Sequence, residues 1–280
     1  MEKYAIVTGA SSGFGLHITI ELAKAGFTVV ATMRNLSKQH IVHEVIQDSQ
    51  ILERIRFTEL DVTNSLSIQE FQDFIQSLSP IDLLINNAGF AQAGFAEELS
   101  IDAYRQQFET NLFGVMAITQ VILPHMRTNR KGTILMMSSI SGQIGFPGLS
   151  AYVASKQALE GYAESLRLEL APYNVQVALI EPGSYQTNIW SSGLANIRTH
   201  EHSPYQRTLA MLKQHVKKAS PAYGDPKEVA HLVVKLAREE RLTRLRYPIG
   251  KGVRLTVFMK HILPWSIWQK LILKNIFKSS

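Results

Sequence analysis

Seven short apolar runs alternate with segments of helical periodicity, and this alternation limits the possible folds more than any other feature of the sequence. The runs are rich in β-branched residues and carry few charges, which indicates strands buried on both faces. The expected strands are 4–7, 28–32, 56–60, 83–86, 132–138, 175–180 and 246–249. The expected helices are 14–25, 65–77, 101–127, 151–171 and 226–239. The sequence therefore predicts an α/β fold with a doubly wound, seven-stranded parallel sheet and helices on both faces.

The chain of 280 residues shows no internal repeat and no linker, so a single domain over 1–280 is expected. The stretch 188–223 has no clear element apart from an amphipathic piece at 205–216, and it is the candidate substrate lid. The absence of cysteine excludes disulfides, thiolate metal sites and a cysteine nucleophile, and it is compatible with a cytoplasmic protein.

The net charge of +6 raises the question of a nucleic-acid partner. The basic excess gathers after residue 200, without a zinc-finger or helix-turn-helix spacing, so no nucleic acid is expected. The nine histidines include no HExxH pair beside an acidic cluster, so no metal is expected either. No GxSxG sequence points to a serine hydrolase.

A glycine-rich loop follows the first expected strand and precedes a helix. Its spacing is GxxxGxG, and such a loop lets backbone N–H groups reach a pyrophosphate at a helix N-terminus. The expected dinucleotide contacts in this loop are Gly9, Ser11, Ser12, Gly13, Phe14 and Gly15.

The end of the second strand, where an acid would select NAD(H), has Arg34 followed by Asn35. No acid lies nearby, and the planar guanidinium suits the 2′-phosphate of NADP(H). The sequence therefore predicts NADP(H) in preference to NAD(H), with Arg34 and Asn35 as contacts.

Tyr152 and Lys156 lie one turn apart on one face of an expected helix. Ser139 lies thirteen residues before Tyr152. A neighbouring ammonium favours the phenolate, so it would lower the tyrosine pKa and tune this residue for acid/base work.

Taken together, these motifs resemble those of the short-chain dehydrogenase/reductases, in the TGxxxGxG and YxxxK branch with steroid- and retinol-dehydrogenase-like members. The resemblance spans nearly the whole chain and implies a Rossmann fold. Its motifs are Thr8–Gly15, Asp61-Val62, Asn86-Asn87-Ala88-Gly89, Asn111, Ser138-Ser139, Tyr152–Lys156 and Pro182-Gly183 with Thr187.

The resemblance implies a catalytic role for four residues. Ser139 would hydrogen-bond the substrate oxygen, Tyr152 would transfer the proton, and Lys156 would bind the nicotinamide ribose. Asn111 would anchor a water in a proton relay. The residues implied to hold the rest of the cofactor are Asp61 and Val62 at the adenine, Asn87, Ala88 and Gly89 along the cleft, and Pro182, Gly183 and Thr187 at the nicotinamide.

These observations predict an oxidoreductase that interconverts a carbonyl and an alcohol with NADP(H). An apolar substrate is expected from side chains near the mouth of the site, namely Phe146, Leu149, Trp190, Leu194, Tyr205 and Leu209. Two alternatives remain open: a 3-oxoacyl-thioester reductase and a catalytically silent NADP-sensing module. A sugar-nucleotide epimerase or dehydratase is disfavoured by the GxxxGxG spacing.

The extension 253–280 contains a basic amphipathic segment with lysines at 270, 274 and 278. Its recurring lysines rule out a membrane span but allow contact with a membrane surface. Its apolar face could instead pack on the substrate lobe or on a partner subunit. The family resemblance implies a homodimer or homotetramer.

Overall fold

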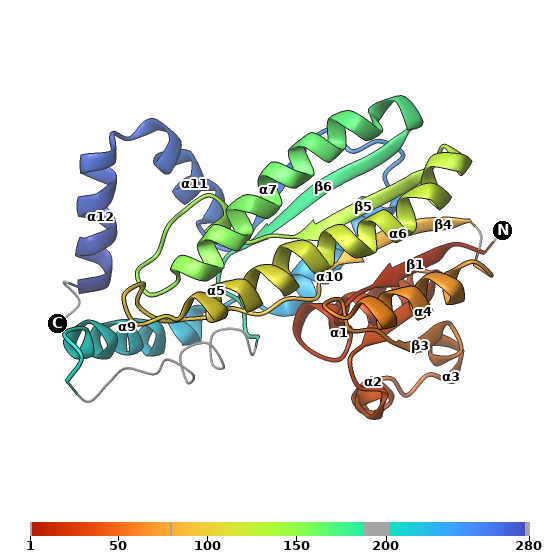
Figure 1. Ribbon diagram of the computed structural model, residues 1–280, viewed down its shortest axis with the longest axis horizontal. Coiled ribbons are helices and arrows are strands. Elements are labelled where there is room, and N and C mark those ends of the chain that lie inside the picture. The colour runs from red at the N-terminus through yellow and green to blue at the C-terminus, as the bar shows by residue number, and fades with distance from the viewer. Residues whose placement is uncertain (1, 79, 188–201, 278–280) are drawn as a thin grey trace.

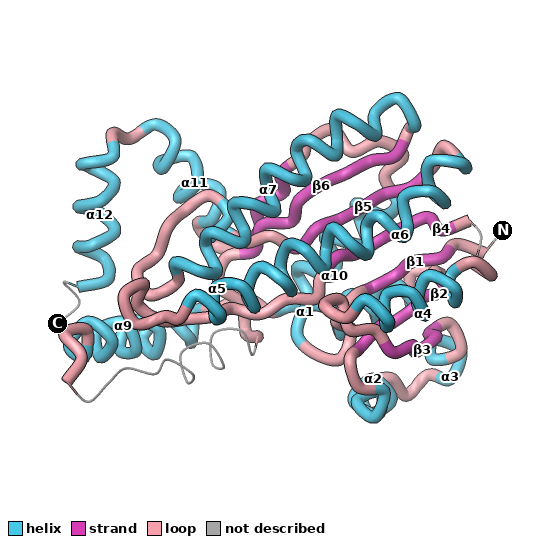
Figure 2. Tube along the Cα trace, in the orientation of Figure 1, coloured by secondary structure: helices cyan, strands magenta, loops and turns pink. Residues whose placement is uncertain are grey.

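The computed structural model describes residues 2–78, 80–187 and 202–277, and it contains a parallel sheet covered by helices on both faces (Figure 1). The strands lie side by side in the order β3-β2-β1-β4-β5-β6-β7, and Figure 2 shows β3 to β6 of this sheet in magenta. The strands are β1 (Tyr4–Val7), β2 (Thr28–Met33), β3 (Ile55–Glu59), β4 (Ile81–Asn86), β5 (Gly132–Met137), β6 (Val175–Pro182) and β7 (Arg246–Ile249). The predicted α/β fold is confirmed, and each predicted strand end lies within two residues of the observed one.

The helices of the described residues include the five predicted ones, one of which is divided in two. They are α1 (Gly13–Lys24), α2 (Gln39–Val45), α3 (Ser49–Leu52), α4 (Ser65–Ile75), α5 (Ile101–Phe108), α6 (Gly114–Asn129), α7 (Ser150–Leu170), α9 (Gln206–Ala219), α10 (Pro226–Arg238), α11 (Val253–Ile262) and α12 (Trp265–Phe277). The short helices α2 and α3 were not predicted. The single helix expected over 101–127 is divided into α5 and α6 by a π-helical turn, Glu109–Phe113.

One face of the sheet packs against α1 and α10. Strand residues such as Val7, Val29 and Ile85 point to this face. They form one buried cluster with apolar side chains of the two helices, including Leu22 and Val233. The alternation follows from the period of two in a strand, which sends successive side chains to opposite faces.

The opposite face packs against α4, α6 and α7. Ile6, Val30 and Ile134 point to this side and join Ile118 of α6 and Leu166 of α7 in a second buried cluster. Because both faces carry apolar side chains, the strands read as continuous apolar runs in the sequence.

The order of the strands reverses at β1, which pairs with β2 on one side and with β4 on the other. In open parallel sheets, a ligand crevice lies beyond the carboxyl ends of the strands at such a point. The glycine loop after β1 and the Asn87 segment after β4 meet there, so the topology places the predicted site residues at one edge of the sheet.

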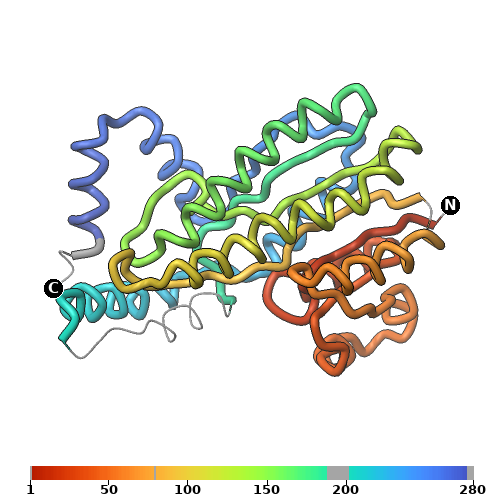
Figure 3. The backbone as a smooth tube through the Cα atoms, in the orientation of Figure 1, coloured from red at the N-terminus to blue at the C-terminus, as the bar shows by residue number. Residues whose placement is uncertain are grey.

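The elements α9, α11 and α12 lie beyond this edge rather than over the sheet, as the cyan and blue parts of the tube show (Figure 3). Of the predicted lid 188–223, residues 188–201 lie outside the described residues, and α9 forms most of the remainder. Trp268 of α12 is buried, and Ile272 packs against the apolar cluster that contains Phe146 and Leu212.

Two leucines of α7 provide a matched test of the core. Leu166 is 4% exposed and Leu168 is 73% exposed. We expect Leu166→Ala to lower the free energy of unfolding by about 2–5 kcal/mol, because it removes buried methyl groups and leaves a cavity. Leu168→Ala should change it by no more than about 0.5 kcal/mol. Urea denaturation of both variants measures the difference, and equal losses would contradict the packing described here.

Candidate active site

The glycine loop is held to β4 by hydrogen bonds that cross the crevice. The Thr8 hydroxyl accepts from the backbone N–H groups of Asn87 and Ala88, both at 2.9 Å. The Asn87 side-chain amide donates to the carbonyls of Thr8 and Gly9, at 2.9 and 3.1 Å. Asn87 therefore fixes the shape of the loop, in addition to lining the crevice.

Two glycines of the loop adopt a conformation that other residues rarely take. Gly9 has φ +68°, and a Cβ there would lie 2.9 Å from the Ala88 Cα, which is too close for any side chain. Gly13 has φ +54° and begins α1. The loop thus needs glycine at both positions to bring its backbone next to the crevice.

A cavity of about 430 Å³ runs from the glycine loop to the end of β2. The predicted cofactor residues that line it are Gly9, Ser11, Ser12, Gly13, Phe14, Arg34, Asn35, Asp61, Val62, Asn87, Ala88, Gly89 and Thr187. Gly15 does not line it, because this residue packs beneath the loop against the Gly9 carbonyl and the Asn87 amide. Lys38 lines it but was missed, because it reaches the cavity from a short 3₁₀ turn, Leu36–Lys38, that the sequence does not reveal.

This cavity fits a dinucleotide. The N-terminus of α1 faces it, where backbone N–H groups and the helix dipole favour a pyrophosphate. Arg34 and Lys38 place two cations at the far end, where an adenosine ribose would lie. Burial opposes ionisation of Asp61, but hydrogen bonds from Thr63 and the charge of Arg34 outweigh it and lower the pKa of this carboxyl.

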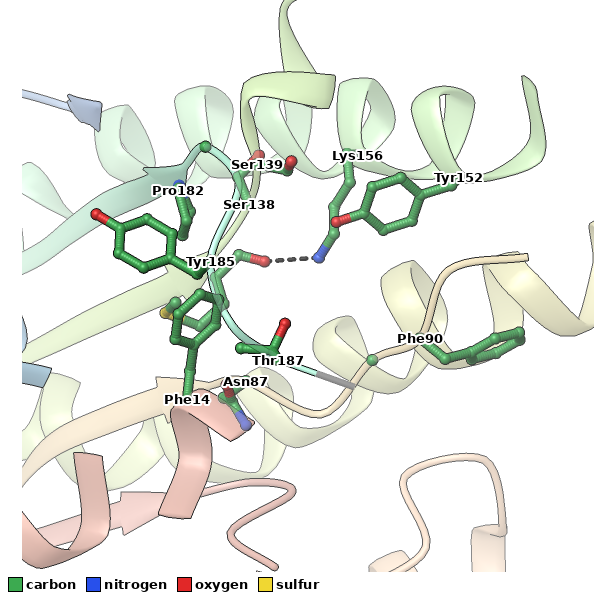
Figure 4. Close-up of a pocket in the computed structure, with 13 residues that line it drawn as sticks. Phe14, Asn87, Phe90, Ser138, Ser139, Tyr152, Lys156, Pro182, Tyr185 and Thr187 are labelled. Atoms are coloured by element: carbon green, nitrogen blue, oxygen red, sulfur yellow. Dashed lines mark hydrogen bonds between the residues drawn. The ribbon is translucent and has the colours of Figure 1, made fainter. Parts of the chain in front are cut away.

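A second cavity adjoins the first and contains Ser139, Tyr152 and Lys156 (Figure 4). The Ser139 side chain lies beside the Tyr152 hydroxyl and acts to lower its pKa. The Ser139 Oγ accepts from the Ser141 N–H at 3.1 Å. The Lys156 ammonium donates to the Met137 carbonyl at 2.6 Å and lies 5.8 Å from the centre of the Tyr152 ring. The predicted Ser-Tyr-Lys group is therefore assembled in one place.

The expected lowering of the tyrosine pKa was wrong for the chain by itself. Burial raises the pKa of Tyr152 to about 12, and the neighbouring Ser139 side chain offsets only part of this effect. Burial lowers the pKa of Lys156 to about 8, although the nearby charge of Glu160 acts in the opposite direction. Desolvation is therefore the largest influence on the pKa of both groups.

Asn111 lies in the π-helical turn and is fully buried. Its side chain accepts from the Phe90 N–H at 3.1 Å and donates to the Phe90 carbonyl at 3.0 Å and to the Ser155 hydroxyl at 3.2 Å. The two bonds to the Phe90 backbone position Phe90, which lines the cavity of Tyr152. The role of Asn111 in a proton relay stays a prediction.

The segment that follows β6 closes the other side of the Tyr152 cavity. Pro182, Gly183 and Thr187 line it, as predicted for a nicotinamide site. Tyr185 packs edge-on against Phe14 of the glycine loop, with ring centres 5.5 Å apart. This aromatic contact joins the loop to the β6 segment across the cavity, as Figure 4 shows.

A buried pair of acids behind the site was not predicted. Glu160 accepts from the Ser138 hydroxyl at 2.8 Å and from the Arg246 guanidinium at 2.9 Å. Glu181 accepts from the Gln143 amide at 2.6 Å and also faces Arg246, at 3.6 Å. Burial, followed by the nearby charge of Glu160, raises the pKa of Glu181 to about 8. Glu181 therefore keeps its proton at neutral pH.

Comparisons with known proteins agree with this geometry. The family model described as short chain dehydrogenase matches residues 3–197. An uncharacterized oxidoreductase, YusZ of Bacillus subtilis, is 46% identical over 278 residues and covers 99% of both chains. Human retinol dehydrogenase 8 is 36% identical over 202 residues, which cover 71% of this chain and 64% of the relative. The crystal structure of a short-chain dehydrogenase from Streptomyces avermitilis superposes with a TM-score of 0.79 at 31% identity, covering 98% of this chain and 96% of that one.

The buried acid pair predicts how stability depends on pH. In the unfolded chain a glutamate ionises near pH 4.3, whereas folded Glu181 keeps its proton to about pH 8. The folded state then binds more protons between these values, so this group lowers stability as the pH rises through that window. We expect Glu181→Gln to make the unfolding free energy fall less steeply between about pH 5 and 8.

Urea denaturation across this range measures the slope. Glu164→Gln is the matched control, because Glu164 also pairs with Arg246, at 3.1 Å, but is exposed. A slope that Glu181→Gln leaves as steep as in the parent chain would contradict the raised pKa of Glu181.

Proposed function

Because the chain belongs to the short-chain dehydrogenase/reductase family, we propose that it uses NADP(H) to interconvert a carbonyl and an alcohol on a small apolar molecule, with Tyr152 as the general acid/base. Membership of this family makes the chain an NAD(P)-dependent oxidoreductase that acts on CH–OH groups. The observation that carries the proposal is that Ser139, Tyr152 and Lys156 line one cavity, next to the dinucleotide cavity, with the Lys156 ammonium beside the Tyr152 ring.

The chemistry of this group suits carbonyl reduction. NADPH, when bound, supplies the hydride. The hydroxyls of Ser139 and Tyr152 can both donate to the substrate oxygen, where negative charge develops as the carbonyl carbon is reduced. Tyr152 is protonated at neutral pH and can give its proton to that oxygen, which completes the alcohol. The Lys156 ammonium, next to the ring, stabilises the phenolate that remains.

An apolar substrate is supported by a third cavity, of about 160 Å³, which begins at Ile140 directly after Ser139. Side chains from the loop before α7, from α9 and from α12 enclose it, mostly with carbon atoms; they include Phe146, Leu149, Leu212, Val216, Tyr223 and Ile272. Of the mouth residues predicted from the sequence, Phe146 and Leu149 line this cavity, and Trp190 and Leu194 lie outside the described residues. The relative named retinol dehydrogenase 8 is consistent with an apolar alcohol or aldehyde as substrate.

The preference for NADP(H) is supported by the two cations at the end of the dinucleotide cavity. Arg34 follows β2, where a 2′-phosphate would lie, and Lys38 lines the same end. A guanidinium and an ammonium there would pair with the phosphate that distinguishes NADP(H) from NAD(H).

Replacement of Tyr152 tests the reaction. We expect Tyr152→Phe to keep NADPH binding and to lose at least about 100-fold in turnover, because the ring remains while the transferable proton is lost. The measurement is NADPH oxidation with retinal-like and aliphatic aldehydes, steroid ketones, quinones and a β-ketoacyl thioester. Tyr162→Phe, a matched change further along α7, should leave turnover unchanged.

The same panel separates the alternatives. Near-normal turnover in Tyr152→Phe would contradict the proposed role of the tyrosine. Turnover confined to the β-ketoacyl thioester would favour the thioester reductase. A parent chain that binds NADPH and reduces none of the compounds would favour the NADP-sensing module.

Replacement of Arg34 tests the cofactor preference. We expect Arg34→Asp to weaken NADPH binding at least about tenfold relative to NADH, because it removes a phosphate contact and adds a repelling charge. Titration of the intrinsic fluorescence with each cofactor gives the two affinities. Arg56→Asp on β3 adds the same charge at a position that does not line the cavity and serves as the control. If the ratio of NADPH affinity to NADH affinity is unchanged in Arg34→Asp, Arg34 is not the residue that selects NADP(H).

A further inference from the structure

The helices α11 and α12 carry an unusual set of exposed apolar side chains, which we name the tail surface. It consists of Leu255, Phe258, Ile262, Ile267 and Leu271, which are between 45% and 65% exposed. In Figure 1 the two helices form an arm that extends away from the sheet. Apolar side chains gathered in this way mark a contact site for a partner or a membrane.

The inner side of the arm packs on the rest of the protein, and the tail surface lies on its exposed side. Trp268 is buried, and Ile272 packs on the cluster that includes Phe146 and Leu212. Ile267 and Leu271 lie one position before these two residues and remain exposed. The same helix therefore has a packed apolar side and a free one.

The segment that carries the tail surface has charged side chains of one sign only. Residues 241–280 contain no aspartate and no glutamate. The exposed or partly exposed cations next to the apolar side chains are Lys251, Arg254, Lys260, Lys270 and Lys274. Lys260 lies over the Trp265 ring, with its ammonium 4.7 Å from the ring centre, at the corner where α11 meets α12.

The exposed apolar side chains and the cations together distinguish between possible binding partners of the tail surface. A second copy of the chain would bring one all-basic segment against another, and like charges would repel. An anionic bilayer surface matches both the apolar side chains and the cations, because its acyl boundary accepts the first and its phosphates attract the second. No helix in the described part of the chain is long and apolar enough to cross a membrane, so contact along the surface is the mode that fits.

We propose that the tail surface binds an anionic lipid bilayer, with α11 and α12 lying along the interface. Leu255 and Phe258 enter the boundary between headgroups and acyl chains, while Lys270 and Lys274 contact lipid phosphates. The proposal rests on exposed side chains and charge, and it is independent of the reaction catalysed.

Co-sedimentation of the full-length chain with vesicles tests this proposal. We expect the chain to sediment with vesicles of phosphatidylcholine and phosphatidylglycerol, and at least about tenfold less with phosphatidylcholine alone. Raising the salt from about 0.1 to 0.5 M should weaken binding. NADPH binding measured alongside shows that each variant is folded, so a failure of lipid binding is distinguishable from a failure of the proposed function.

Matched variants separate the two contributions. Leu255→Ser with Phe258→Ser should lower vesicle binding at least about tenfold, whereas Leu66→Ser with Leu168→Ser, two exposed leucines on α4 and α7, should leave it unchanged. Lys270→Glu with Lys274→Glu should abolish the preference for anionic vesicles. The control for that change is Lys227→Glu with Lys235→Glu on α10.

Three results would overturn the proposal. The first is absence of binding to anionic vesicles by the parent chain. The second is an equal loss in the tail-surface variants and their controls. The third is a dimer in sedimentation velocity that Leu255→Ser with Phe258→Ser converts to a monomer while no form binds vesicles, because the tail surface would then be an interface between two copies.

Discussion

The parallel pairing of β1 with β4 is the constraint on which the rest of the site depends. It brings two loops from distant parts of the chain to one edge of the sheet, and the Thr8 hydroxyl and the Asn87 amide then join them. The glycine loop thus takes its shape from hydrogen bonds to the neighbouring strand as well as from its own glycines. The cavity exists because the sheet topology reverses there.

Desolvation governs the chemistry of the second cavity. Burial favours the neutral form of both Tyr152 and Lys156, so it moves their pKa values in opposite directions. The phenol consequently keeps its proton at neutral pH. The Met137 carbonyl fixes the ammonium near the ring, where a positive charge is most useful after the proton has left. The arrangement suits proton donation better than proton abstraction in the chain by itself.

The sequence predicts what depends on local pattern. Apolar runs locate the strands, and the spacing of Tyr152 and Lys156 places both on one face of α7. It does not predict what depends on distant partners: Glu181 stands in an apolar strand, and nothing nearby indicates that Arg246 will face it. The π-helical turn at Asn111 is also invisible, because one extra residue per turn shifts the helical face that a regular period would assign.

The C-terminal helix α12 has apolar side chains on two different sides, which the division into one apolar face and one lysine face does not describe. The sequence pattern sets an apolar face against a lysine face, and it leaves open whether the apolar face packs on the protein or meets a membrane. In the structure, Trp268 and Ile272 pack inward, while Ile267 and Leu271 stay exposed next to Lys270. Apolar residues in adjacent positions along α12 therefore occupy two sides of the helix. One side closes the apolar cavity near Ser139, and the other is free to bind lipid, so the two interpretations do not compete.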